Sequence, residues 1–165
     1  MNKQQLKAFA EAALGNKIWL EPSIDEMKLV EFIRTLRPKN VGIPMLRIGS
    51  QGDGAYLLPD DLKGISTCVS PGVSTEVSFD EEMAERGIEV YMADASVDGP
   101  PLTNKGFHFT KRFLEVYDSE SNIRLDTLCE TIPNNHEGDR VLQMDIEGAE
   151  YRVLLDASDQ TLKRF

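Results

Sequence analysis

The chain has 165 residues, 28 of them acidic against 18 Lys and Arg, which gives a formal net charge of −10 and a pI near 4.7. With 41% hydrophobic residues it can bury a substantial core, so an intrinsically disordered chain is excluded. The negative charge disfavours nucleic acid and anionic membranes as partners, and no apolar run reaches the roughly 18 residues that cross a bilayer. We therefore expect a soluble, cytoplasmic protein.

Two helical patterns precede residue 40. Apolar residues recur at helical spacing over residues 6–14 and again over 24–36, and Pro38 prevents the second helix from continuing. We expect these two helices to form an N-terminal segment, 1–40, that belongs to one folding unit with the rest of the chain, 41–165.

Strand patterns alternate with helical ones in the remainder of the chain. A hairpin is predicted first, because two short apolar segments flank the glycine-rich turn SQGDG. The alternation that follows it predicts an α/β fold with a mainly parallel sheet. The predicted strands are 45–48, 55–58, 67–70, 89–93, 107–113 and 141–146, and the predicted helices are 77–86, 123–132 and 148–155.

Candidate site residues follow three of these strands. In an open α/β sheet, ligands bind beyond the carboxyl ends of the strands, which here are followed by 70–76, Asp94 and 145–150. Asp94 lies 22 residues after Gly72 (94 − 72), the spacing at which a carboxylate can accept hydrogen bonds from both hydroxyls of a ribose. The alternative is that Asp94 only caps the turn that follows its strand.

The helix that follows Gly72 begins with acidic residues. Its first turn holds Asp80, Glu81 and Glu82, and Glu76 precedes it. Acids suit the positive end of a helix, but they repel the pyrophosphate of a dinucleotide. S-adenosylmethionine has no phosphate and carries a sulfonium and an ammonium group, so it tolerates nearby acids. Because the turn after the strand at 67–70 also lacks a GxGxxG motif, we expect S-adenosylmethionine rather than NAD as the cofactor.

Four segments between about Arg47 and Leu155 carry a family resemblance: RIGSQGDGAYLLPDDL, CVSPGVSTEVSFDEEMAERGIEVYMADAS, IRLDTLCE and LQMDIEGAEYRVLL. They resemble the FkbM-type and methyltransferase-like group of class I S-adenosylmethionine-dependent methyltransferases, and MDIEGAE is the most specific part. The resemblance implies a Rossmann-like sheet that is incomplete at its C-terminal side. It also implies a small-molecule substrate, with methyl transfer to an oxygen of a sugar or other small metabolite.

By this resemblance the cofactor site comprises Ser70, Gly72, Val73, Glu76, Asp94 and Asp145. A hydroxyl acceptor needs a base that takes up its proton, for which Asp145 is the first candidate and Glu147 the second. Glu150 would help to shape the acceptor side. The alternative for these acids is structural, because they lie near the start of a helix. No metal site is predicted.

Other interpretations stay open. The chain could be a non-catalytic, truncated Rossmann-like module for binding or interaction, or a nicotinamide-dependent oxidoreductase. The turn QGDGAY could fold across the strand ends, although an ordinary hairpin turn is favoured. A fifth core strand is missing from the pattern, which would leave the edge of the strand at 141–146 bare. We expect self-association as a homo-oligomer along this edge, its coverage by the C-terminal segment, or a chain cut from a longer enzyme.

Overall fold

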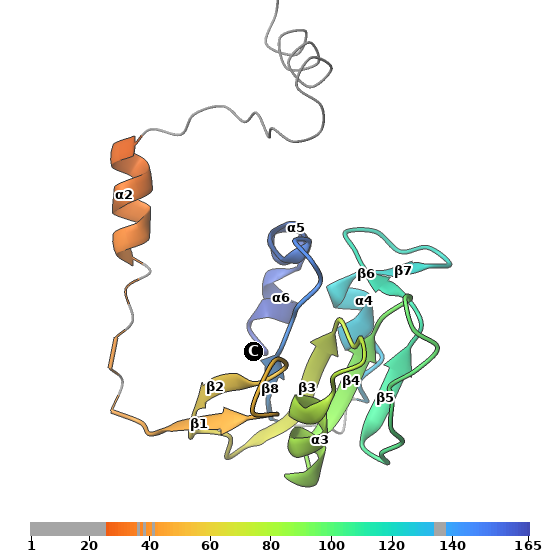
Figure 1. Cartoon of the computed structure of the whole chain (residues 1–165). Helices are drawn as coiled ribbons and strands as arrows, with labels where there is room; N and C mark the ends of the chain where they lie inside the picture. The colour runs from red at the N-terminus through yellow and green to blue at the C-terminus, as the bar shows by residue number, and fades with distance from the viewer. Residues whose placement is uncertain (1–25, 36, 38, 41, 134–137) are drawn as a thin grey trace, which may run out of the picture. The chain divides into compact units, whose positions relative to one another are not determined.

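The structure is a computed structural model that describes residues 26–35, 37, 39–40, 42–133 and 138–165. Contacts divide the chain into two units, Met1–Val41 and Gly42–Phe165. In the first unit, α2 (Glu26–Thr35) corresponds to the second predicted helix (Figure 1). The helix predicted over 6–14 lies outside the described residues. That the two predicted segments fold as one unit stays a prediction.

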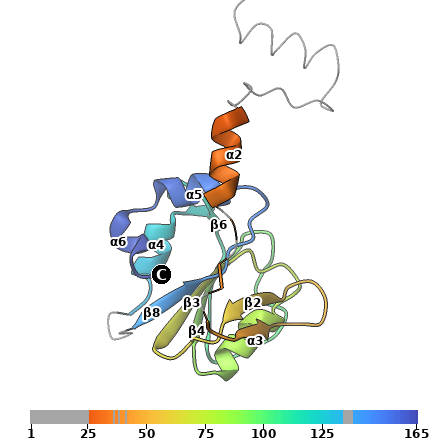
Figure 2. The same cartoon turned by 90° about the vertical axis from the view of Figure 1, so that its left-hand side faces the viewer.

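A four-stranded parallel sheet forms the centre of the second unit (Figures 1 and 2). Its strands are β3 (Ile65–Pro71), β4 (Glu89–Ala93), β5 (Phe107–Thr110) and β8 (Asp139–Leu142), in the order β5-β4-β3-β8. All three pairings are parallel, which confirms the predicted α/β fold with a mainly parallel, Rossmann-like sheet. Because β3 lies between β4 and β8, the carboxyl ends of these three strands are neighbours.

Alternate residues of the central strands face two separate apolar cores. Val69 and Tyr91 face a cluster that includes residues of α4 (Leu125–Glu130) and α5 (Glu150–Asp156). The adjacent Cys68 and Val90 face the opposite cluster, to which α3 (Ser78–Glu85) and the hairpin contribute. Burial on both faces, which is typical of parallel strands, explains why neither β3 nor β4 alternates between buried and exposed residues; even Thr67 and Ser70 of β3 are buried.

The predicted hairpin is present and lies against α3. Its strands, β1 (Met45–Ile48) and β2 (Tyr56–Pro59), pair in antiparallel register. In the connecting turn, the Gly49 amide donates to the Glu82 carboxylate at 3.0 Å, and the Ser50 amide donates to the Ser78 hydroxyl at 2.7 Å. The first five residues of α3 thereby hold the hairpin turn near the carboxyl end of β3.

The strands and helices after β4 differ in detail from the prediction. The strand predicted over 107–113 ends at Thr110, and a two-stranded parallel ribbon follows, formed by β6 (Phe113–Leu114) and β7 (Asn122–Ile123). The helix predicted over 123–132 is the shorter α4. A last helix, α6 (Asp159–Leu162), was not predicted; the Ser158 side chain caps it by accepting a hydrogen bond from the Thr161 amide at 3.2 Å.

Strand β8 is shorter and earlier than the predicted 141–146. Its pairing with β3 extends as far as the Gln143 amide, which donates to the Val69 carbonyl at 3.0 Å. On the outer edge, the Arg140 amide donates to the Arg164 carbonyl at 2.9 Å, and Phe165 packs against the apolar cluster beneath. The C-terminal segment therefore contacts this edge at Arg140 and, through the Arg164 guanidinium, which donates to the Gly138 carbonyl at 3.1 Å, just before β8. Among the described helices, none has the length and apolar character needed to cross a membrane.

Candidate functional site

Gly72 and Asp145 bring two strand ends into close contact. Gly72 follows β3, has a φ of 91° and donates its amide to the Ala93 carbonyl at 3.0 Å. A Cβ atom built at Gly72 would lie 2.0 Å from the Asp145 carbonyl oxygen. Only glycine permits both the left-handed backbone and this approach. Gly72 is a predicted cofactor-site residue, but in the structure the space beside its Cα is taken by the main chain that follows β8.

The Asp94 carboxylate faces the bend after β3 and is buried, with 7% of its surface exposed. Its Oδ2 accepts hydrogen bonds from the amides of Val73 at 3.0 Å and Ser74 at 3.2 Å. Its Oδ1 accepts from the amide and hydroxyl of Ser96, at 2.7 and 2.6 Å. Burial raises the pKa of Asp94, but these hydrogen bonds outweigh it and leave the pKa below its ordinary value.

Four hydrogen bonds occupy the acceptor positions of this carboxylate, since an ionised carboxyl group offers about four. Asp94 thus holds the bend, in which Ser74 adopts a positive φ of 46°. The hydrogen bonds from Ser96, in the turn after β4, are the capping role that the sequence left as the alternative, whereas the contacts that hold the bend after β3 were not predicted. Ribose binding by Asp94 stays a prediction, and a ribose hydroxyl would have to share or replace the contacts of Ser96.

Beyond these strand ends lies a cavity of about 400 Å³, here called the strand-end pocket. Asp94 and Ser96 line it after β4, and Gly72 lines it after β3. Two lining residues that sequence reasoning missed, Glu115 and Arg152, form an ion pair at its rim. The other lining residues come from the bend after β3, the end of β4, β6 and the loop between β8 and α5: Ser74, Ala93, Phe113, Leu114, Asp145, Ile146, Glu147 and Ala149.

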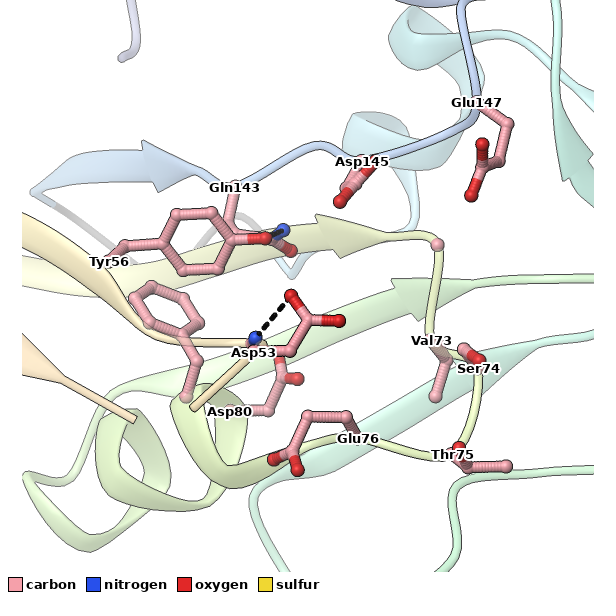
Figure 3. Close-up of a pocket in the computed structure, with 13 residues that line it drawn as sticks. Asp53, Tyr56, Val73, Ser74, Thr75, Glu76, Asp80, Gln143, Asp145 and Glu147 are labelled. Atoms are coloured by element: carbon pink, nitrogen blue, oxygen red, sulfur yellow. Dashed lines mark hydrogen bonds between the residues drawn. The ribbon is translucent and has the colours of Figure 1, made fainter. Parts of the chain in front are cut away.

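A second cavity of about 210 Å³, the hairpin pocket, lies between the hairpin turn and the same strand ends (Figure 3). It shares four lining residues with the strand-end pocket, namely Gly72, Ser74, Asp145 and Glu147. Its other lining residues come from the hairpin, from α3 with the segment before it, and from the end of β8: Asp53, Gly54, Tyr56, Val73, Thr75, Glu76, Phe79, Asp80 and Gln143. The hairpin turn therefore lies against the strand ends.

The hairpin pocket is strongly acidic. Five carboxylates line it, and no Lys, Arg or His is among its lining residues: Asp53, Glu76, Asp80, Asp145 and Glu147. Asp80 is 5% exposed, and burial raises its pKa to about 6. Nevertheless, within the part of the chain that the structure describes, no group of three or more His, Cys, Asp or Glu side chains is arranged to hold a metal ion.

Gln143 links three parts of the site. Its Oε1 accepts from the Ser70 hydroxyl at 2.7 Å, and its Nε2 donates to the Tyr56 hydroxyl at 2.9 Å. Burial is the main cause that raises the pKa of Tyr56. Sequence reasoning missed Gln143, although a signal exists: it lies two residues before Asp145, and side chains at this spacing in an extended segment share a face.

The predicted site residues take different positions. Asp145 and Glu147 line both pockets, and Glu147 has a positive φ of 58°. Ser70 is buried behind the bend and lines neither pocket. Glu150 also lines neither; its Oε1 accepts from the amides of Ile146 at 2.9 Å and Gly148 at 3.3 Å. Hydrogen bonds to backbone amides, its own included, lower the pKa of Glu150.

Glu76 lines the hairpin pocket and also accepts a hydrogen bond from the Ser78 amide at 2.8 Å; hydrogen bonds with Ser78 lower its pKa. Val73 lines the hairpin pocket through the bend that Asp94 holds. The structure thus brings together Gly72, Val73, Glu76, Asp94, Asp145 and Glu147 around the two pockets, whereas Ser70 and Glu150 support the surrounding loops. The roles of all these residues in binding or catalysis stay predictions.

Comparison with known proteins gives one match. The family model of the methyltransferase FkbM domain matches residues 11–165, which is nearly the whole chain. No curated protein and no solved structure matches it significantly. The family match confirms the resemblance that the MDIEGAE segment carries, and the parallel sheet agrees with it. The chain therefore belongs to the FkbM methyltransferase domain family.

Proposed function

We propose that the chain is an S-adenosylmethionine-dependent methyltransferase of the cytoplasm that methylates a hydroxyl oxygen of a sugar or another small metabolite. Family membership supports methyl transfer. The observation that carries the site is the convergence of Gly72, Asp94 and Asp145 at three adjacent strand ends, beside the strand-end pocket of about 400 Å³. This volume falls within the range of roughly 300–1,000 Å³ that small-ligand sites occupy.

The residues of the strand-end pocket fit S-adenosylmethionine in position and charge. Gly72 and Ser74 would hold its methionyl part, and Asp94 with Ser96 would hold its ribose. When bound, the cofactor supplies an electrophilic methyl group on a sulfonium. The carboxylates of Asp145 and Glu147 border this pocket, and a cationic sulfonium is compatible with them, whereas a phosphate is not.

Asp145 and Glu147 are also placed to handle the acceptor. Both border the hairpin pocket as well, and among the described residues no protein group donates a hydrogen bond to either side chain. An acceptor hydroxyl entering from the hairpin pocket would meet a carboxylate that is free to accept its proton. The loops on either side would align the acceptor with the methyl group and exclude water, which supplies much of the rate in such a displacement.

A non-catalytic binding module is the second candidate. The filled acceptor positions of Asp94 favour it, because a carboxylate that already holds four protein donors is less available to a ribose. In this case the chain would bind a nucleoside weakly and transfer no methyl group.

Calorimetric titration of the 165-residue chain with S-adenosylhomocysteine, and separately with NAD, tests the proposal. We expect binding of the adenosyl thioether and none of NAD. Transfer of a labelled methyl group from S-adenosylmethionine to a panel of sugars is then measured for the wild type and for Asp145→Asn and Glu147→Gln. The first variant should lose transfer while it retains S-adenosylhomocysteine affinity. Absence of any adenosyl binding would reject the function.

A control variant accounts for the general loss of negative charge. Glu85→Gln removes one charge from an exposed position of α3 that lines neither pocket. It should leave both binding and methyl transfer at the wild-type level. A drop in transfer equal to that of Asp145→Asn would mean that net charge, rather than a base at the strand ends, controls the reaction.

A further inference from the structure

Asp80 is a buried carboxylate with an unsatisfied oxygen. It lies in the first turn of α3, is 5% exposed, and its Oδ1 has no hydrogen-bond partner among the described residues. Proteins rarely leave a buried carboxylate oxygen without a donor or a cation, because the lost hydration is costly. The start of a helix suits an acid, but this does not explain an oxygen that receives no hydrogen bond.

The surroundings of Asp80 increase this cost. Figure 3 shows its carboxylate pointing from α3 into the hairpin pocket, on the side where Asp53 and Asp145 also point. Burial is the main cause that raises the pKa of Asp80 and neighbouring Glu76 raises it further, while Ser70 and the Asp80 amide lower it only in part. Since no cationic side chain lines the pocket, the protein itself supplies no counter-charge there.

We propose that the hairpin pocket recognises an organic ammonium group, with Asp80 as its buried counter-ion. An ammonium carries one positive charge and donates up to three hydrogen bonds, so it can satisfy Asp80 and reach Asp53 or Asp145 at once. The rings of Tyr56 and Phe79, in edge contact with centroids 5.3 Å apart, line the same pocket and suit the carbon atoms that carry the nitrogen.

An ammonium fits better than a metal ion. The carboxylates lie on three separate segments, and no set of three is close enough to coordinate one ion within the described residues. Charge–charge attraction and single hydrogen bonds do not require that spacing. The cavity of about 210 Å³ accommodates a small amine, with room for part of a larger molecule.

This inference rests on the proposed function for the origin of the ammonium, which has two possible sources. It could belong to an amine-bearing methyl acceptor, or to the methionyl end of S-adenosylmethionine reaching past Gly72 and Ser74, which both pockets share. In either case the recognised chemistry is the same, and Asp80 contacts the ligand directly.

Calorimetry at pH 7.5 with matched pairs of probes tests the inference and separates the sources. In the acceptor arm, ethanolamine and D-glucosamine are compared with ethylene glycol and D-glucose, which lack the ammonium. In the cofactor arm, S-adenosylhomocysteine is compared with 5′-methylthioadenosine, which lacks the amino-acid end. A wild-type preference for the ammonium probe in either arm, reduced about tenfold or more in Asp80→Asn, supports the proposal.

Two further variants keep the test decisive. Asp53→Asn changes an exposed turn residue of the same pocket, and it should reduce the same preference even if Asp80→Asn folds poorly. Glu85→Gln, on α3 but outside the pocket, should not reduce it. The proposal is overturned if the wild type shows no ammonium preference in either arm, or if the preference survives in both pocket variants.

The result is distinguishable from failure of the proposed function. If the chain binds ethanolamine or D-glucosamine through Asp80 but binds no S-adenosylhomocysteine, the ammonium site stands and the methyltransferase proposal falls. If it binds S-adenosylhomocysteine and 5′-methylthioadenosine equally and no amine, the methyltransferase proposal stands and the ammonium site falls.

Discussion

Two buried aspartates near the strand ends differ in their hydrogen bonding and in the direction of their pKa shifts. Asp94 is buried but receives four hydrogen bonds, and its pKa lies below the ordinary value. Asp80 is similarly buried but has an oxygen without a partner, and its pKa rises to about 6. The same side chain therefore stabilises the fold at one position and destabilises it at the other, because hydrogen-bond donors surround Asp94 and are too few around Asp80.

The raised pKa of Asp80 makes stability depend on pH. Its folded-state pKa of about 6 exceeds the ordinary 3.8, so the folded protein binds the proton more tightly than the unfolded chain. The resulting stabilisation is complete below pH 3.8 and is lost as the pH rises through 6, by about 3 kcal/mol in total. The side chain of Asp80→Asn cannot ionise. The free energy of unfolding of this variant, relative to that of the wild type, should therefore increase from pH 4.5 to pH 7.5.

Urea unfolding of the wild type, Asp80→Asn and Glu85→Gln at these two pH values measures the effect. Glu85→Gln should follow the wild type at both, since Glu85 is exposed. A difference between Asp80→Asn and the wild type that does not change with pH would show that Asp80 titrates normally.

Asp94→Ala should destabilise the bend after β3 and should also weaken the binding of an adenosyl ligand. The substitution leaves the amides of Val73 and Ser74 without an acceptor, and we expect a loss of about 1–3 kcal/mol in unfolding free energy. Adenosyl binding, measured by calorimetry, should weaken by a similar amount. Ser96→Ala, which removes only one of the four donors, is the graded comparison. Unchanged stability in Asp94→Ala would remove Asp94 from its structural role.

At the scale of elements, the contact between the ends of β3 and β8 is the tightest point of the site. Gly72→Ala places a methyl group against the Asp145 carbonyl, whereas Gly64→Ala has the same kind of backbone, with a φ of 94°, and open space around it. Gly64→Ala should therefore cost only the left-handed strain, about 1–2 kcal/mol. Gly72→Ala should cost clearly more, as measured by urea unfolding. Equal losses would contradict the contact.

Local sequence patterns predicted most of the helices and strands but not the tertiary contacts between them. The sheet, the hairpin and α3 follow from alternation, a glycine-rich turn and helical spacing. The ribbon of β6 and β7 was missed because strands of two residues leave no periodicity to detect.

The candidate site was likewise only partly predictable from the sequence. Asp145 and Glu147 were predicted because residues after a parallel strand gather at one edge of the sheet. For the hairpin, the sequence left open that the QGDGAY turn folds across the strand ends but favoured an ordinary turn. The docking of this turn onto α3, which forms the hairpin pocket, joins segments about 30 residues apart, and no local pattern encodes such a contact. The amides of Val73 and Ser74, which fill acceptor positions of the Asp94 carboxylate, are about 20 residues away in the sequence. The spacing between Asp94 and Gly72 therefore could not show that these positions are already filled.

At the scale of the Gly42–Phe165 unit, the order β5-β4-β3-β8 leaves one side of β8 without a partner strand among the described residues. The backbone of Arg164 covers this side at Arg140, and Phe165 anchors the segment on the apolar cluster. Such an edge is a template for pairing with another copy of the chain.

Removal of Arg164 and Phe165 should therefore promote self-association. Size-exclusion chromatography with light scattering is expected to give a larger mass for the shortened chain than for the full chain at the same concentration. Phe165→Ala, which keeps the backbone of Arg164, should give an intermediate result. Identical masses for all three chains would mean that the edge of β8 does not direct association.

The boundary between the two cavities has a consequence for redesign. Main-chain atoms, the Gly72 backbone and the Asp145 carbonyl, meet there. Substitution cannot trim main-chain atoms, so the passage between the two chambers can be widened by side-chain changes only at the other shared residues, Ser74, Asp145 and Glu147. At Gly72 itself, an engineer who seeks room for a bulkier molecule would have to change the loop that follows β8.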